Sequence, residues 1–203
     1  MCDMVKLLRT AFGRIPDSRA SNTVHSLVDV LTSAFAVFAL KYPSLLSFQE
    51  QTPMERHNLK QLFELKHKCS DSQMRRILDE ISPDVLNPCF SACFNTLQQL
   101  KVLRSFLFRK KHLLLSVDGV HYFHSNKIKC KRCQVTHHKN GDISYQHSML
   151  GAVLVHPQRR EVFPLACQHI SKQDGQSKMI VNSMRLSAYL QIYLNVMKNS
   201  PLF

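Results

Sequence analysis

Near the middle of the chain the sequence reads Leu113-Leu114-Leu115-Ser116-Val117-Asp118-Gly119. A short apolar run that ends in one acid is typical of a buried strand. Downstream, Asn140-Gly141 is a strong signal for a hairpin turn, and the runs 128–136 and 143–155 flank it as two further strands. A last apolar segment covers 161–165. The sequence therefore predicts that this part of the chain consists mostly of antiparallel strands.

The first half of the chain has a helical pattern instead. Ser70-Asp71-Ser72-Gln73 has capping-box spacing and predicts the start of one helix, and Pro83 suits the first position of the next. We expect a helix pair at 71–102, which is either a helix-turn-helix that contacts DNA or an ordinary helical hairpin. An earlier helix should end at Tyr42-Pro43. Its apolar residues, which recur at helical spacing and should face the core, are Leu27, Leu31, Ala34, Phe35 and Phe38.

Together these patterns predict an α+β protein. A helical N-terminal domain should cover residues 1–105, and a strand-rich domain should cover 106–178 with a cysteine and histidine hairpin at 127–145. With 203 residues and 44% hydrophobic residues, the chain can bury a core in each part.

The charge balance points to a polyanionic partner. Lysine and arginine number 27 against 14 acids, which gives a formal net charge of +13. Double-stranded nucleic acid is the leading candidate, and the alternative is a ribosome-associated or simply basic protein. The basic residues that we expect to contact DNA are Arg75, Arg76, Lys101, Arg104, Arg109, Lys110 and Lys111.

The cysteines and the apolar runs favour a cytoplasmic protein. The chain has seven cysteines, an odd number that is scattered among 11 histidines rather than arranged as a secreted disulfide framework. No signal peptide is visible at the first residues. The most apolar run, 27–40, is shorter than the roughly 20 residues that span a bilayer, so we expect no membrane partner.

Asp118 is the sharpest candidate for chemistry. A carboxylate at the end of a strand is held rigidly. The following residue, Gly119, has no side chain and so leaves room beside the backbone for a metal or a phosphate. Metal-dependent phosphoryl transfer uses two or more such carboxylates around Mg²⁺. The alternative is an ordinary turn at the end of a strand.

A second candidate is a cluster of zinc-ligand residue types. Cys130 and Cys133 form a CxxC motif, and His137 and His138 follow closely. Zinc takes four such ligands, and two cysteines at this spacing can bind one ion from a turn. The alternative is two free thiols beside solvent-exposed histidines. The remaining histidines His124, His147 and His169 are expected to be surface or strand-packing residues.

The order of several segments resembles bacterial insertion-sequence transposases of the DDE class, IS4-like in type. The resemblance runs from about residue 12 to Lys178, and many segments occur in the same order. They are Leu31-Thr32-Ser33-Ala34-Phe35-Ala36-Val37-Phe38, Lys41-Tyr42-Pro43-Ser44-Leu45-Leu46, Ser70 to Arg75, Ser116-Val117-Asp118-Gly119, Lys129 to Gly141, Tyr145 to Val153 and Gln173-Asp174-Gly175.

The resemblance implies an RNase H-like catalytic α/β domain, of which this chain would hold the first antiparallel strands. Asp118 would be the first acid of the DDE triad and a ligand of Mg²⁺ or Mn²⁺. The partner would be DNA at the ends of the mobile element, with self-association and a location at the bacterial nucleoid. Asp174 sits where the family has a turn that enters a helix.

The sequence departs from the family after Lys178. The only acids after Asp118 are Asp142, Glu161 and Asp174, and residues 175–203 contain none, so the second Asp and the Glu of the triad are absent. The tail 179–203 reads as if it were out of frame, because a shift by one base permits the family's Asp, Cys, Glu, Asn and Ala in order. Either a mutation or a programmed frameshift explains this.

Three hypotheses follow for the function. The first is a truncated transposase that binds DNA and is inactive alone, although the intact form would cleave and transfer DNA strands. The second is a non-catalytic DNA-binding regulator. The third is a basic zinc-hairpin protein without a role in transposition.

Overall fold

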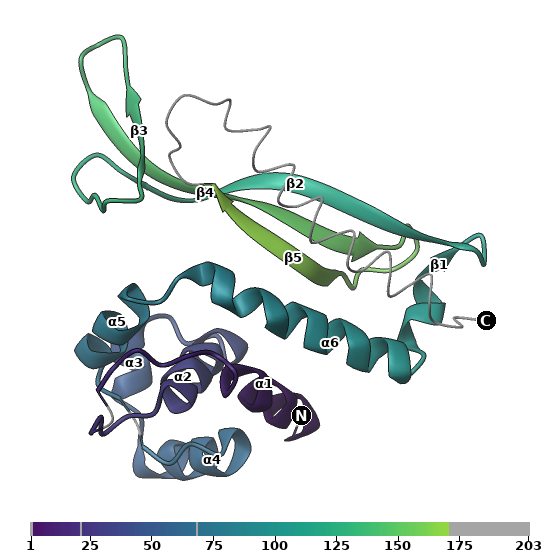
Figure 1. Ribbon diagram of the computed structural model, residues 1–203, viewed down its shortest axis with the longest axis horizontal. Helices are drawn as coiled ribbons and strands as arrows, with labels where there is room; N and C mark the ends of the chain where they lie inside the picture. The colour runs from purple at the N-terminus through teal and green to yellow at the C-terminus, as the bar shows by residue number, and fades with distance from the viewer. Residues whose placement is uncertain (1, 21, 68, 171–203) are drawn as a thin grey trace. The chain divides into compact units, whose positions relative to one another are not determined.

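The computed structural model describes residues 2–20, 22–67 and 69–170, and the chain divides into two compact units, Met1–Cys93 and Phe94–Phe203 (Figure 1). The helices and the antiparallel strands confirm the α+β class. An RNase H-like domain stays a prediction. The expected out-of-frame tail and the Asp174-Gly175 motif lie outside the described residues.

The first unit is helical. Its elements are α1 (Cys2–Phe12), α2 (Leu27–Ala39), α3 (Leu45–Gln49), α4 (Pro53–Phe63), α5 (Asp71–Asp79), the 3-10 helix η1 (Pro83–Leu86) and the beginning of α6 (Asn87–Gln99).

Side-chain caps explain where these helices begin. The Ser26 hydroxyl accepts the backbone N–H of Asp29, which satisfies one of the unpaired donors at the start of α2. Thr52 with Glu55, and Ser70 with Gln73, form capping boxes at α4 and α5. The helix start predicted at Ser70 is therefore confirmed. Pro83 begins a 3-10 turn rather than an α-helix, and α6 starts at Asn87.

The core of the first unit gathers apolar side chains from several helices. Val30 and Leu31 of α2 pack with Phe48, Phe63 and Met74. One predicted core residue is wrong, because the Phe38 side chain is 81% exposed. At that end of α2 the buried residues are Ala36 and Val37. Phe38 follows them, and the rotation of the helix places its side chain on the exposed face.

The second unit contains a small antiparallel sheet. Its elements after α6 are the 3-10 helix η2 (Val102–Phe106), β1 (Leu107–Phe108), β2 (His112–Ser125), β3 (Gln134–His137), β4 (Ile143–Val155) and β5 (Phe163–Ile170). β4 pairs with β2 along one edge and with β3 and β5 along the other. Phe94 and Leu97 of α6 pack with Leu154 and Leu165 on one face of this sheet.

Register defines what lies on the opposite face. Asp118 of β2 is opposite Gly151 of β4, which is opposite Cys167 of β5. Directly opposed residues in an antiparallel ladder project to the same side. Leu150, Ala152 and Leu154 belong to the core. The three residues at the level of Asp118 therefore lie on the face away from that core, because side chains alternate along a strand.

The strand that carries Asp118 is longer than predicted. We expected it to end at Asp118, but β2 continues to Ser125. Gly119 does not form a turn, because it stays in the ladder opposite Leu150, and the long partner strand β4 supports the residues beyond it. Asp118 thus lies in the middle of a strand.

The hairpin predicted at Asn140-Gly141 is confirmed. Gly141 has a φ of 88° and its N–H donates to the carbonyl of His138 at 3.0 Å. The preceding strand is shorter than the predicted run 128–136, because β3 begins only at Gln134. Residues 126–133 form a loop, and this loop carries the CxxC motif.

Candidate functional site

Asp118 is exposed on the sheet face away from the core. Its Oδ1 atom accepts the backbone N–H of Gly119 at 2.7 Å. Gly151 stands opposite it, and among the described residues no atom other than those of its chain neighbours lies within 4 Å of where a Cβ of residue 151 would be. The described part of the chain therefore leaves room beside this carboxylate.

Asp118 does not belong to a cluster of potential metal ligands in the described part of the chain. The one group of three or more histidine, cysteine or acidic side chains found among residues 2–20, 22–67 and 69–170 does not contain Asp118. Asp142 lies in the turn between β3 and β4, where it accepts a hydrogen bond from Asn140, and Glu161 is exposed between β4 and β5. These residues alone do not fit a magnesium site, which needs more oxygen ligands of fixed geometry.

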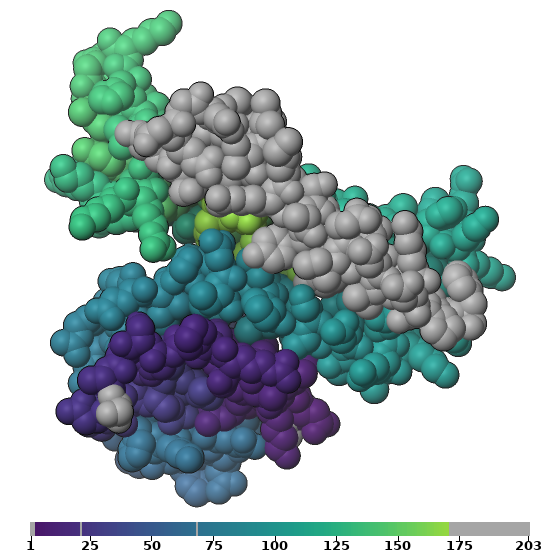
Figure 2. Space-filling model, viewed as in Figure 1, coloured from purple at the N-terminus to yellow at the C-terminus, as the bar shows by residue number. Residues whose placement is uncertain are grey.

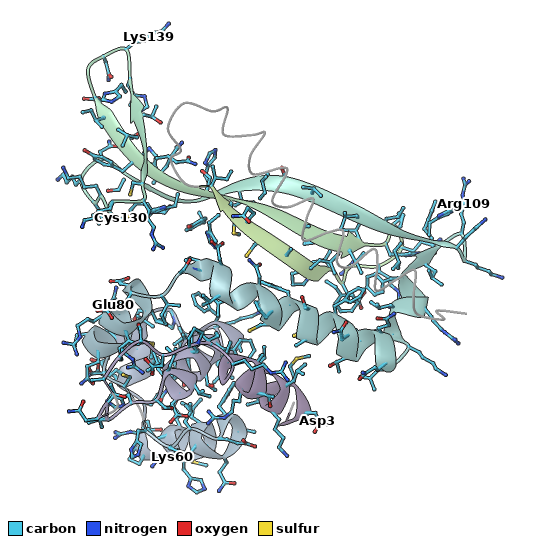
Figure 3. All side chains as sticks on the ribbon, viewed as in Figure 1. Asp3, Lys60, Glu80, Arg109, Cys130 and Lys139 are labelled. Carbon is cyan, nitrogen blue, oxygen red and sulfur yellow. The ribbon has the colours of Figure 1, made fainter. Side chains whose placement is uncertain are left out.

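The CxxC motif does meet a histidine. Cys130 Sγ and Cys133 Sγ are 3.6 Å apart, and His147 Nε2 is 3.3 Å from each of them. Cys130 and Cys133 come from the loop before β3, whereas His147 comes from β4. Figure 3 labels Cys130 at this loop and Lys139 at the tip of the β3–β4 hairpin.

Aromatic side chains surround the histidine. The Tyr122 ring is stacked on the His147 ring at 5.9 Å between centroids, and Phe123 lies at 5.5 Å. The Tyr122 hydroxyl is 3.1 Å from Nδ1 of His169. Burial, and to a lesser extent the nearby thiols, raise the pKa of Tyr122. Burial also raises the pKa of Cys133, while the backbone N–H of Cys130 acts in the opposite direction.

The two histidines predicted as zinc ligands lie elsewhere. His138 Nε2 is 2.8 Å from the Ser144 hydroxyl, across the start of the hairpin, and His137 is exposed opposite Ile143. The sequence predicts that His147 is one of the surface or strand-packing histidines. The sequence signal for it was weak, because His147 is separated from Cys133 by the whole hairpin and reaches the cysteines only when β4 folds back beside the loop.

The basic residues predicted to contact DNA are all exposed. In the first unit, Arg75 and Arg76 lie on α5, and Arg75 donates to Asp71 at 2.7 Å. In the second unit, Arg109 and Lys110 form the turn between β1 and β2 with positive φ angles of 50° and 59°. Lys111 follows them, and Lys101 and Arg104 lie at η2.

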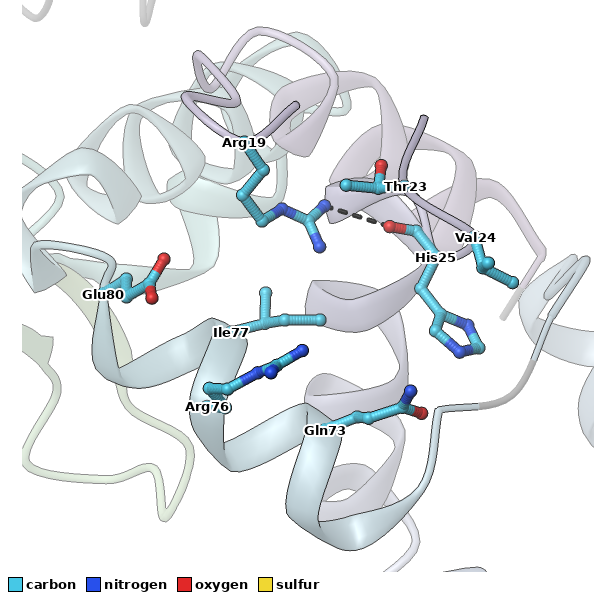
Figure 4. A pocket seen from close by; sticks show the side chains of 8 residues that line it. All are labelled: Arg19, Thr23, Val24, His25, Gln73, Arg76, Ile77 and Glu80. Atoms are coloured by element: carbon cyan, nitrogen blue, oxygen red, sulfur yellow. Dashed lines mark hydrogen bonds between the residues drawn. The ribbon is translucent and has the colours of Figure 1, made fainter. Parts of the chain in front are cut away.

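A cleft of about 380 Å³ lies beside α5 in the first unit. Figure 4 shows Arg19 and Arg76 on either side of Ile77. Arg19 is held by Asp17 at 2.7 Å and by the carbonyl of His25 at 3.0 Å. Glu80 also lines the cleft. The lining of the cleft therefore carries one acidic group beside its two arginines.

One family model matches the first unit of the chain. Residues 9–93 match the family model described as DDE_Tnp_1-associated, and this range covers most of the unit Met1–Cys93. The match points to a transposase-related function. Searches of curated proteins and of solved structures gave no match. Among the described residues, no helix combines the length and the apolar character that crossing a membrane requires.

Proposed function

We propose that this chain is a DDE-transposase-related protein that binds double-stranded DNA at the ends of a mobile element, at the bacterial nucleoid. The observation that carries the proposal is the family match over residues 9–93. The net charge of +13 supports it, because DNA is a polyanion and phosphate contacts dominate its affinity for proteins.

Arg76 is the strongest single candidate for a phosphate contact in the first unit. It is exposed on α5 and lines the cleft, whereas its neighbour Arg75 is already paired with Asp71. In the second unit the candidate is the turn that carries Arg109, Lys110 and Lys111. All three side chains are exposed, and the guanidinium of Arg109 lies over the Phe108 ring at 5.3 Å from its centroid.

In an intact transposase of this class Asp118 would be the first of three acids that hold Mg²⁺ or Mn²⁺. Asp118 lies on β2 outside any group of three or more potential metal ligands among the described residues, and residues 175–203 contain no acid. We therefore propose that residues 1–203 do not cut DNA by themselves. The same observation favours a second candidate function, a DNA-binding regulator without catalysis.

Binding to a fluorescent duplex, measured over a series of salt concentrations, tests the DNA proposal. The affinity should fall linearly on logarithmic axes as salt rises. Arg76→Gln should weaken binding and reduce the salt slope by about one, because one phosphate contact is lost. Lys60→Gln on α4 removes the same charge elsewhere on the first unit and is the matched control. Equal effects of the two changes, or binding that does not depend on salt, would count against the proposal.

A further inference from the structure

We propose that Cys130, Cys133 and His147 bind one zinc ion. The three ligand atoms form a triangle with edges of 3.6, 3.3 and 3.3 Å. Tetrahedral zinc with ordinary bond lengths places two sulfurs about 3.8 Å apart and a sulfur and a nitrogen about 3.6 Å apart. The observed sulfur–sulfur edge is shorter by about 0.2 Å and the sulfur–nitrogen edges by about 0.3 Å, so one ion fits with a small outward movement of the side chains.

The backbone of the loop is arranged to stabilise the sulfurs as ligands. The N–H of Arg132 donates to Cys130 Sγ at 3.3 Å, and the N–H of Cys130 donates to Cys133 Sγ at 3.1 Å. The N–H of Cys133 donates to the carbonyl of Cys130 at 3.2 Å and closes the turn. Hydrogen bonds to a sulfur favour its thiolate form, which is the form that binds a metal.

The histidine is also held in position before any metal binds. Its ring lies against Tyr122 and Phe123, and this packing fixes the direction in which Nε2 points. His147 stands in β4, which pairs with β2 on one side and with β3 on the other. A ligand on such a paired strand is rigid. The ligands Cys130 and Cys133 lie in a loop, and a bound ion would hold this loop against β4.

Two thiolates and one imidazole suit zinc better than a hard cation such as Mg²⁺, which prefers oxygen ligands. In the described part of the chain no fourth histidine, cysteine or acid joins the group. Because Cys130 is exposed, water from the solvent would complete the coordination of the ion.

The ion would join the loop 126–133 to β4. This loop carries Lys127, Lys129, Lys131 and Arg132, and all four are exposed. Figure 2 shows the green atoms of the loop and of the β3–β4 hairpin standing out from the surface. A bound zinc would therefore give these basic side chains a fixed arrangement. This inference does not depend on the proposed transposase function, because it rests only on the three ligands and their backbone.

Metal analysis of the purified full chain tests the inference, with about one zinc per chain expected. Cys130→Ser, Cys133→Ser and His147→Asn should each lose the ion. His137→Asn, which changes an exposed histidine of the same hairpin, should retain it. Zinc retained in His147→Asn, or lost in His137→Asn, would overturn the ligand assignment.

A second measurement covers variants that fail to fold. Cobalt added to the metal-free wild-type chain should produce the visible absorption of a thiolate-bound tetrahedral ion, and alkylation of the thiols beforehand should abolish it. Absence of zinc and of a cobalt spectrum, with Cys130 and Cys133 freely alkylated or joined as a disulfide in the chain as purified, would refute the site.

Discussion

The guanidinium of Arg9 donates a hydrogen bond to the buried carboxylate of Asp29 at 3.0 Å. The side chain of Asp29 is only 3% exposed, and Arg9 also donates to the Thr32 hydroxyl and to the carbonyl of Phe63. The pair thus links α1, α2 and the end of α4 inside the first unit. A buried charge needs its partner, because the interior solvates it poorly.

Asp29→Ala should therefore destabilise the first unit by about 3 kcal/mol, since it leaves the largely buried guanidinium with only the more exposed carboxylate of Glu64, at 3.9 Å, as a counter-charge. Urea unfolding followed by circular dichroism measures the change. Asp71→Ala is the matched control, because it breaks the ion pair with Arg75 at the surface and should have a much smaller effect. A similar loss in both variants would show that burial of the pair does not matter.

The β1–β2 turn contains a second stability test. Lys110 has a φ of 59°, a left-handed conformation that disfavours side chains other than glycine and asparagine. Lys110→Gly should raise the free energy of unfolding of the second unit by about 1 kcal/mol. Lys111→Gly removes the same charge at a residue without positive φ and should not stabilise. A stabilisation by both changes would indicate an effect of charge rather than of backbone conformation.

A pH dependence is expected from Asp17. Two hydrogen bonds from the Arg19 guanidinium, at 2.8 and 2.7 Å, and one from the Arg19 backbone N–H, at 3.1 Å, hold the pKa of Asp17 below its usual value. Because the folded-state pKa is lowered, the stabilisation is present above the unfolded pKa of about 3.9 and is lost as pH falls through the lower folded value. Asp17→Asn should remove this part of the acid-induced loss of stability. Acid unfolding curves of equal shape for the two proteins would contradict the prediction.

Strand cleavage is the decisive measurement for catalysis. The full chain should not cut a duplex that carries the element's own ends in Mg²⁺ or Mn²⁺, because two-metal chemistry needs several carboxylates around ions roughly 4 Å apart. A version with the reading frame restored near codon 178 should cut, and Asp118→Ala in that version should abolish the activity. Efficient cleavage by the 203-residue chain would show that other acids complete the site.

Part of the helical unit could be predicted from the sequence. Local signals decide where its helices begin. The Ser70–Gln73 capping box, for example, can be recognised from four consecutive residues. The same local reasoning failed for Phe38, because the direction of a side chain at the end of a helix depends on which other elements cover that end. The buried pair of Arg9 and Asp29 was also missed, since nothing in a sequence connects residues 20 positions apart.

The sheet was predicted in outline and missed in detail. Asn140-Gly141 marks its turn by residue type, but the β1–β2 turn uses Arg109 and Lys110, which carry no such signal. The metal-ligand prediction had the same limit. Proximity in sequence favoured His137 and His138, whereas pairing of β3 with β4 brings His147 to the cysteines. Register, which spacing alone does not reveal, determines which residues meet.

The outer edge of β2 has a consequence for handling the protein. Among the described residues only the short β1 pairs with that edge, at His112 and Leu113. Beyond them, Leu115, Val117, Val120 and Tyr122 are each between 44% and 50% exposed. A long, partly apolar strand with unpaired backbone groups is a template for pairing with another chain. A polypeptide cut down to residues 94–170 should therefore aggregate on concentration, and charged substitutions at Val117 and Val120 should keep it in solution.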